Sequence, residues 1–164
     1  MENKKFRSEY CSHYPILIKA VQETTGPVLE LGTGVFSTPL LHWICGDRKL
    51  VSCESHPEYI DFLKQYETEN HLVWKITEFW EIPTRFLDDN KYGVVFIDHS
   101  PKRPRQRADD AIRFVDSELV VLHDTGRDLH KYGYERVFPL FKYRYDKNNT
   151  TVLSNYIDVT KWEV

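Results

Sequence analysis

The stretch GPVLELGTGVFSTPLL, residues 26–41, decides how the chain is interpreted. Its apolar run, residues 28–31, ends at Gly32 and Gly34, and a second apolar run follows Pro39. This order predicts a β-strand, a tight turn and an α-helix. Because the free amides at a helix start attract anionic or strongly polar groups, the turn predicts a ligand site. Several cofactors bind to such turns, so the turn alone does not identify the ligand.

Length and composition are those of one ordinary globular domain spanning residues 1–164. The 164 residues are 41% hydrophobic and 29% charged, with a formal net charge of -3. That charge gives no overall attraction to nucleic acid or to an anionic membrane. The three cysteines have no metal-site spacing, and we find neither a secretion signal nor an apolar run of about 18 residues. We therefore expect a cytoplasmic protein with reduced thiols and no membrane segment.

Short apolar runs alternate with helix-like segments along most of the chain. A terminal pair of strands, joined by the turn-rich DKNN, predicts a β-hairpin. The alternation predicts a Rossmann-like, three-layer α/β sandwich with a mostly parallel, seven-stranded sheet and an antiparallel C-terminal hairpin. Ligands of such sheets bind at the carboxyl ends of the strands. We expect strands at 28–31, 50–53, 72–76, 94–97, 119–122, 141–145 and 150–157, and helices at 13–23, 39–45, 59–66, 81–87, 107–115 and 129–138.

Local signals predict where two of these helices begin. Thr38 followed by Pro39 is typical of a helix cap and first turn, and Gly46 predicts the end of that helix. Ser55 and Glu58 have the spacing of a capping box. The first 25 residues are expected to form an N-terminal cap helix region, and residues 26–164 the cofactor-binding core.

The glycine turn partly fits a dinucleotide site. Gly32 and Gly34 match the first two glycines of G-x-G-x-x-G, Ser37 replaces the third, and Glu54 stands 20 residues after Gly34. Glu30, inside the strand end, argues against this interpretation because a carboxylate would crowd a pyrophosphate. The predicted hairpin argues the same way. An NAD(P)-dependent oxidoreductase therefore remains an alternative, but it is not the favoured one.

Glu30-x-Gly32-x-Gly34, with Glu54 ending the second strand, resembles the class I S-adenosylmethionine-dependent methyltransferases from about residue 26 onward. The segments VSCESHPEYIDFLK, VVFIDHSP and VVLHDT are similar to a poorly characterised branch of small members. The resemblance implies S-adenosylmethionine as cofactor and S-adenosylhomocysteine as product. It places Gly32 and Gly34 under the methionine part, Glu30 near the amino-acid end and Glu54 on both ribose hydroxyls. Near the adenine it places Thr77 or Glu78.

Two acidic residues follow neighbouring strands, Asp98 after 94–97 and Asp124 after 119–122. One interpretation is a divalent metal site, for which hard cations require several oxygen ligands. The other is that Asp98 holds the cofactor's amino group or the substrate, while Asp124 orients a neighbour or the substrate. Thr125 would be a poor third ligand, so we favour the interpretation without a metal.

Three basic residues accompany these acids. His99 or Asp98 is the candidate proton acceptor, because an imidazole in the loop after 94–97 titrates near neutrality. Strand alternation would point His123 away from Asp124, which predicts a packing role. Arg107 belongs to a run of cations and is a candidate to bind an anionic substrate group. Among the aromatic residues, Trp80, Tyr132 and Tyr134 are candidates to line a pocket.

The predicted function is methyl transfer to an oxygen or nitrogen nucleophile of an unknown small molecule, with an anionic acceptor compatible with Arg107. The net charge argues against nucleic acid as acceptor, and so does the sequence DHSP at 98–101 where DNA amino-methyltransferases have Asn/Asp-Pro-Pro-Tyr. Two alternatives remain open: an S-adenosylmethionine-binding scaffold or partner subunit without transfer activity, and the oxidoreductase. A homodimer that completes the pocket also remains open.

Overall fold

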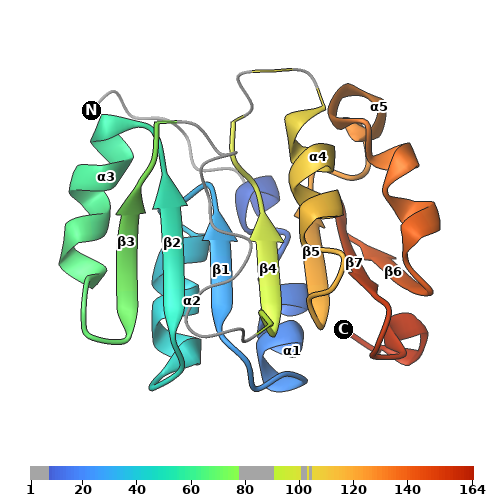
Figure 1. Ribbon diagram of the computed structural model, residues 1–164, viewed down its shortest axis with the longest axis horizontal. Coiled ribbons are helices and arrows are strands. Elements are labelled where there is room, and N and C mark those ends of the chain that lie inside the picture. The colour runs from blue at the N-terminus through green and yellow to red at the C-terminus, as the bar shows by residue number, and fades with distance from the viewer. Residues whose placement is uncertain (1–7, 78–90, 101–102, 104) are drawn as a thin grey trace.

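The structure is a computed structural model that describes residues 8–77, 91–100, 103 and 105–164 (Figure 1). Seven strands form one sheet in the order β3-β2-β1-β4-β5-β7-β6. The pairs from β3 through β5 are parallel, and β7 is antiparallel to both β5 and β6. This confirms the predicted fold class. The strands are β1 (Val28–Leu31), β2 (Leu50–Glu54), β3 (His71–Lys75), β4 (Val94–Ile97), β5 (Leu119–His123), β6 (Tyr143–Lys147) and β7 (Thr150–Ser154).

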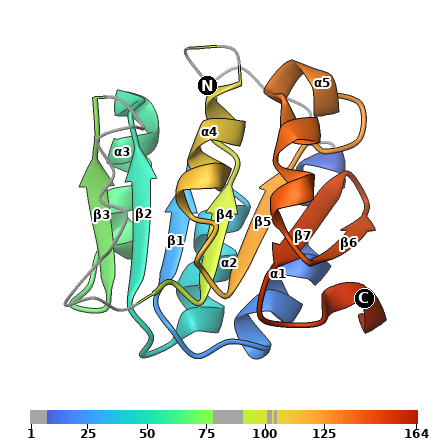
Figure 2. The ribbon, with the colours of Figure 1, turned by 45° about the vertical axis from the view of Figure 1, so that its right-hand side comes forward.

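Helices cover both faces of the sheet, with α1 and α2 behind it and α4 in front (Figures 1 and 2). The short η1 (Ser8–Cys11) precedes α1, and none of the helices in the described part of the chain is both long and apolar enough to span a membrane. The α-helices are α1 (Tyr14–Gln22), α2 (Ser37–Cys45), α3 (Pro57–Leu63), α4 (Gln106–Arg113) and α5 (Leu129–Tyr132).

Strand alternation divides the interior into two apolar clusters. On β4, Val94 and Phe96 pack in the cluster that contains α1 and α2, whereas Val95 and Ile97 pack with α4. Successive strand residues point to opposite faces, and both faces of this sheet are covered, so β1, β4 and β5 are apolar almost throughout. The exception within β1 is Glu30, which therefore needs buried polar partners.

Several local predictions are wrong in detail. The helix expected at 129–138 stops at Tyr132, because Gly133 adopts φ 71 and two 3-10 turns, η4 (Tyr134–Arg136) and η5 (Phe138–Leu140), follow. The N-cap residues of α2 and α3 are Phe36 and His56, and neither helix has a side-chain cap bond. The expected helix at 81–87 lies outside the described residues.

The predicted end of α2 and the predicted hairpin are confirmed, although β6 extends through Lys147 and leaves only two residues in the turn. Gly46 is the C-cap residue of α2, with φ 56. The hairpin between β6 and β7 turns at Asn148 and Asn149, which have φ values of 49 and 63. Positive φ at both central residues is what a tight two-residue hairpin turn requires, and asparagine tolerates it better than most side chains.

Candidate functional site

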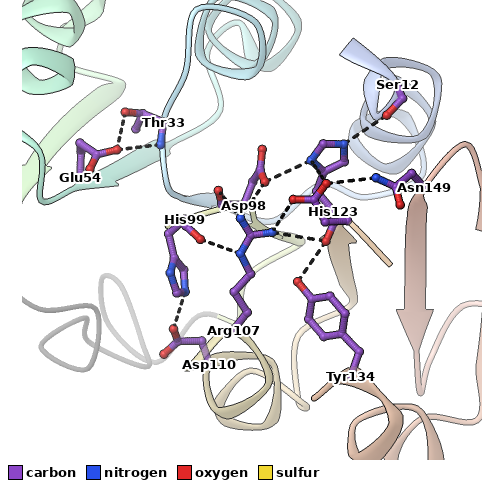
Figure 3. Close-up of polar contacts among 11 residues, drawn as sticks. Ser12, Thr33, Glu54, Asp98, His99, Arg107, Asp110, His123, Tyr134 and Asn149 are labelled. Atoms are coloured by element: carbon purple, nitrogen blue, oxygen red, sulfur yellow. Dashed lines mark hydrogen bonds and ion pairs between the residues drawn. The ribbon is translucent and has the colours of Figure 1, made fainter. Parts of the chain in front are cut away.

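The predicted site residues converge at the carboxyl ends of β1, β2, β4 and β5. Because β1 pairs with both β2 and β4, the chain leaves β1 and β4 toward opposite faces of the sheet. A crevice forms at such a topological switch point, and open α/β sheets bind their ligands there. Figure 3 shows the polar contacts along this edge.

The glycine turn after β1 is pressed against the loop after β4. Gly32 has φ 86, and a Cβ added there would lie 2.2 Å from the His99 Cα. The Gly32 amide also donates to the Cys53 carbonyl at 3.1 Å. At Gly34 the surroundings are open, since a Cβ would meet only the Ser37 Oγ, at 3.9 Å. Gly32 is therefore needed for packing, and Gly34 leaves the turn accessible.

Glu54 presents a buried, rigidly held carboxylate at the end of β2. Its Oε2 accepts from the Thr33 amide at 3.1 Å and from the Thr33 hydroxyl at 2.9 Å (Figure 3). Its Oε1 accepts from the amides of Ser55 and His56 at 2.7 and 2.8 Å. Neutral amide and hydroxyl donors fix this carboxylate without cancelling its charge. Glu54, rather than Ser55, thus binds the free amides just before α3.

Glu30 lies beneath the turn and not in the crevice. Its carboxylate is fully buried and accepts from the hydroxyls of Ser37 (2.6 Å), Thr38 (3.0 Å) and Ser52 (2.6 Å). Burial raises the pKa of Glu30 to about 7, even though these hydrogen bonds oppose the shift. Thr38 in turn accepts from the Gly34 amide at 3.3 Å. Among the described residues, Thr38 of α2 thus links Glu30 to the glycine turn.

Arg107 joins the ends of β4 and β5. Its side chain is 4% exposed and makes ion pairs of 3.2 Å with both Asp98 and Asp124. It also donates to the His99 carbonyl at 2.6 Å and lies 4.2 Å from the Tyr132 ring centroid. Burial disfavours its charge, yet Asp98, Tyr134 and Tyr132 together outweigh this effect and raise the pKa of Arg107. The guanidinium occupies the place where a metal shared by both carboxylates would lie.

Asp98 is the best-placed acidic group at the crevice. Its Oδ1 lies 3.2 Å from the Arg107 Nη2 and 3.1 Å from the His123 Nδ1 (Figure 3). The side chain remains 26% exposed. Burial alone would raise the pKa of Asp98, but the contacts with His123 and Arg107 prevail and lower it. Asp98 is therefore an ionised carboxylate that is fixed on one side and accessible on the other.

The packing role predicted for His123 is only part of its environment, because its buried ring packs against His13 and also contacts Asp98. Asp124 has φ 59, so the regular alternation of β5 ends at His123, and the two side chains approach to 3.7 Å instead of diverging. The His123 Nε2 lies 3.1 Å from the Ser12 hydroxyl (Figure 3). Burial disfavours the imidazolium, but the hydrogen bond to Asp98 and the charges of Asp98 and Asp124 together outweigh burial and raise the pKa of His123.

His99 is turned away from the crevice. Its fully buried ring places Nε2 2.8 Å from the Asp110 carboxylate on α4 (Figure 3), and burial lowers its pKa. Tyr134 is also fully buried and donates to the His123 carbonyl at 3.0 Å. His99 and Tyr134 thus hold the site together. Thr77 follows β3, whereas Glu78 and Trp80 lie outside the described residues.

No pattern in the sequence pointed to His13 as a site residue. This residue precedes α1 and is 1% exposed, with its ring 5.0 Å from that of His123 and 5.1 Å from that of Phe96. Within the described part of the chain, neither of its ring nitrogens has a hydrogen-bond partner. Burial and, to a lesser extent, the neighbouring His123 lower the pKa of His13 to about 4. A neutral imidazole therefore lies against the Asp98–His123 pair.

Searches for relatives in sequence found no matching family model and no matching curated protein. Solved structures do match. The N-methyltransferase NodS from Bradyrhizobium japonicum WM9 is 13% identical, with a TM-score of 0.60 over 96% of this chain and 100% of NodS. TYW2 from M. jannaschii, in complex with AdoMet, is 13% identical, with a TM-score of 0.51 over 93% of this chain and 77% of TYW2.

The chain has the fold of the class I S-adenosylmethionine-dependent methyltransferases. The matches extend over nearly the whole chain and include the antiparallel end of the sheet, as the resemblance in sequence implies. Spermidine synthase from Thermotoga maritima also matches, at 17% identity and a TM-score of 0.60, over 93% of this chain and 60% of the synthase. The methyltransferase fold by itself therefore does not fix the group that is transferred or the acceptor.

Proposed function

We propose that this chain is an enzyme that transfers a methyl group from S-adenosylmethionine to an oxygen or nitrogen atom of a small acceptor. The observation that carries the proposal is the fixed Glu54 carboxylate beside the glycine turn, at the switch point of a methyltransferase fold. A carboxylate there suits a ligand that offers neighbouring hydroxyl groups, because ionised carboxyl oxygens only accept hydrogen bonds.

The residues of the turn fit this cofactor. S-adenosylmethionine supplies an activated methyl group. The open surroundings of Gly34 leave room for a ligand over the turn, and Glu54 would accept from ribose hydroxyls. Its two oxygens already accept four bonds, so a ribose hydroxyl would replace the Thr33 hydroxyl. Glu30 would act by holding the turn rather than by touching the ligand. Thr77 and Glu78 remain the candidates for the adenine side.

The acceptor side of the proposal centres on Asp98. Its accessible edge would hold the acceptor, or the cofactor's amino group, in line for transfer and receive a proton where the acceptor must lose one. His99 was the other candidate base, but its bond to Asp110 favours a positioning role. Arg107 and Asp124 bind each other, which likewise favours positioning over contact with an anionic substrate.

The structure removes one argument against the oxidoreductase alternative. Glu30 is buried beneath the turn, so its carboxylate would not crowd a pyrophosphate. The case against NAD(P) now rests on the antiparallel β7–β6 end of the sheet. A scaffold would bind S-adenosylmethionine in the same way but would not transfer its methyl group. A measurement of methyl transfer therefore distinguishes the scaffold from the enzyme.

Turnover is tested with methyl-labelled S-adenosylmethionine and a panel of small oxygen and nitrogen nucleophiles. The proposal expects acceptor-dependent formation of S-adenosylhomocysteine, reduced at least about tenfold in Asp98→Asn, because the neutral amide cannot accept a proton. Asp47→Asn changes an exposed residue and serves as the control. Tight cofactor binding without product across the panel would instead support the scaffold, and Asp98→Asn at full rate would remove Asp98 from the mechanism.

A further inference from the structure

Three potential metal ligands from separate segments meet beside the carboxyl ends of β4 and β5. His13 precedes α1, Asp98 follows β4 and His123 ends β5, and one ligand atom from each lies within 4.8 Å of the others. Two imidazoles and one carboxylate are a donor set that suits Fe²⁺, Co²⁺, Ni²⁺ and Zn²⁺ better than Mg²⁺ or Ca²⁺. We infer that His13, Asp98 and His123 form a binding site for one divalent transition-metal ion.

His13 is the observation that points to a ligand. A buried imidazole nitrogen without a hydrogen bond is costly, and native proteins usually satisfy such groups. Both ring nitrogens of His13 lack a partner among the described residues, although the side chain is 1% exposed and packs against His123. A metal ion bound to one nitrogen would give that nitrogen the partner it lacks. It would also explain why a histidine, rather than an apolar residue, packs against Phe96.

The other two ligands are already spaced as a metal requires. His123 Nδ1 and Asp98 Oδ1 are 3.1 Å apart. Two ligands that each lie about 2.1 Å from one zinc ion are about 3.4 Å apart in a tetrahedral site, so this pair needs little adjustment. His13 would approach by a further side-chain movement, since the three atoms span up to 4.8 Å.

Neighbouring residues supply the outer contacts that metal ligands normally have. The His123 Nε2 lies 3.1 Å from the Ser12 hydroxyl, which leaves Nδ1 directed toward Asp98. Arg107 Nη2 contacts the same Asp98 oxygen, Oδ1, at 3.2 Å and holds the carboxylate in place. Such outer contacts orient the ligands of a metal and often change its affinity 10- to 100-fold. The site therefore has both a ligand set and a support for it.

The charges of the region also accommodate a cation. The carboxylates of Asp98 and Asp124 outnumber the guanidinium of Arg107, and a bound ion would displace the proton between His123 and Asp98. This site differs from a metal shared by Asp98 and Asp124, because Arg107 bridges those two carboxylates. It draws instead on the two histidines that lie toward α1.

The consequence for catalysis rests on the proposed function. Asp98 is the partly exposed ligand, so an acceptor in the crevice could reach the ion beside it. A bound metal lowers the pKa of a coordinated hydroxyl group and orients it. The acceptor's proton would then pass to solvent, and Asp98 would act as a ligand rather than as the proton acceptor.

Metal binding is tested without the cofactor, so its result does not depend on methyl transfer. Chelator-treated protein is titrated with Co²⁺ and with Zn²⁺ by calorimetry, and Co²⁺ is also followed by its visible absorption. We expect saturable binding of one ion per chain that excess Mg²⁺ does not displace. His13→Gln should weaken it by about 100-fold or more. The exposed His130, changed to Gln, is the matched control and should bind as the unmodified protein does.

A second variant and a direct measurement guard against loss of folding. His13→Phe replaces the imidazole with a ring that can pack against Phe96, and it should also abolish the site. X-ray absorption of the Co²⁺-loaded unmodified protein should show two imidazole ligands and requires no variant. The inference is overturned if neither ion binds saturably. That result is expected if a buried water molecule, and no metal, lies between the three side chains. Unchanged affinity in a folded His13 variant, or a Co²⁺ spectrum without imidazole, would also overturn it.

Discussion

The two halves of the carboxyl edge hold their carboxylates in different ways. At β1 and β2, Glu54 is held by main-chain amides and one hydroxyl group, none of which carries a charge. At β4 and β5, Asp98 and Asp124 are held by the guanidinium of Arg107 and contacted by His123. The neutral donors leave the negative charge of Glu54 available to a ligand. The network at β4 and β5 neutralises much of the negative charge of Asp98 and Asp124, and its His123 can gain or lose a proton. The first half is suited to hold a polar ligand, and the second to handle protons or a cation.

The two halves of the carboxyl edge are in contact at Gly32. We expect the largest loss of stability from a substitution that disrupts this contact. Gly32→Ala places a Cβ 2.2 Å from the His99 backbone at a positive φ, so the glycine turn or the loop after β4 must move. We expect the free energy of unfolding to fall by about 5 kcal/mol or more. Chemical denaturation of the purified variant measures it.

Gly46→Ala is the matched control for that substitution. Gly46 also has a positive φ, 56, but a Cβ there meets no atom within 4 Å. It should cost only the strain of the backbone, about 1–3 kcal/mol. Equal losses in the two variants would show that the contact between the halves is not tight.

Arg107→Met tests whether the second half depends on a buried charge. The variant leaves the Asp98 and Asp124 carboxylates close together without their shared cation. Removing one partner from such a buried network costs about 3–5 kcal/mol, which equilibrium unfolding in urea would show. Arg144→Met breaks an exposed ion pair with Asp146 and should cost at most about 1 kcal/mol. A similar small loss in Arg107→Met would mean that the network does not hold β4 and β5 together.

Glu30 gives the first half a pH dependence of its own. With its folded-state pKa at about 7, above the ordinary value of 4.5, the buried carboxyl contributes stability below the unfolded pKa that is lost as pH rises through 7. Glu30→Gln should remove this dependence. Between pH 5 and pH 8 the variant should therefore gain about 2–3 kcal/mol relative to the unmodified protein in denaturant unfolding.

Glu58→Gln, on the exposed surface of α3, controls for a general effect of removing a carboxylate. It should leave the pH profile of stability unchanged. If the Glu30→Gln profile also runs parallel to that of the unmodified protein, then Glu30 is ionised throughout this range and the hydroxyl groups around it outweigh burial.

The fold was predictable from sequence because its signals are local. The apolar strands, the glycine turn and the Asn148–Asn149 hairpin each follow from neighbouring residues. Spacing alone also identified Glu54 as a strand-end acid. Alternation within β1 could have shown that Glu30 shares a face with Val28, which packs in the α1–α2 cluster.

The rest of the site could not be predicted in the same way. One backbone angle, φ 59 at Asp124, ends the alternation of β5 and brings the Asp124 carboxylate to within 3.7 Å of His123. The donors of Arg107 meet acceptors on two separate strands, and His13 reaches the site from a segment some 85 residues before Asp98. Such contacts depend on tertiary packing, which no short sequence pattern encodes.

The most direct test of the central claim is a calorimetric titration of the chain with S-adenosylmethionine, S-adenosylhomocysteine and NAD, repeated on Glu54→Gln. The account predicts saturable binding of both adenosyl ligands, weaker binding of NAD, and a loss of about 1.5–3 kcal/mol in the variant, which is roughly ten- to a hundredfold in affinity. Glu58→Gln should bind as the unmodified protein does. Preference for NAD, or full affinity in Glu54→Gln, would contradict the assignment of the first half as the cofactor site.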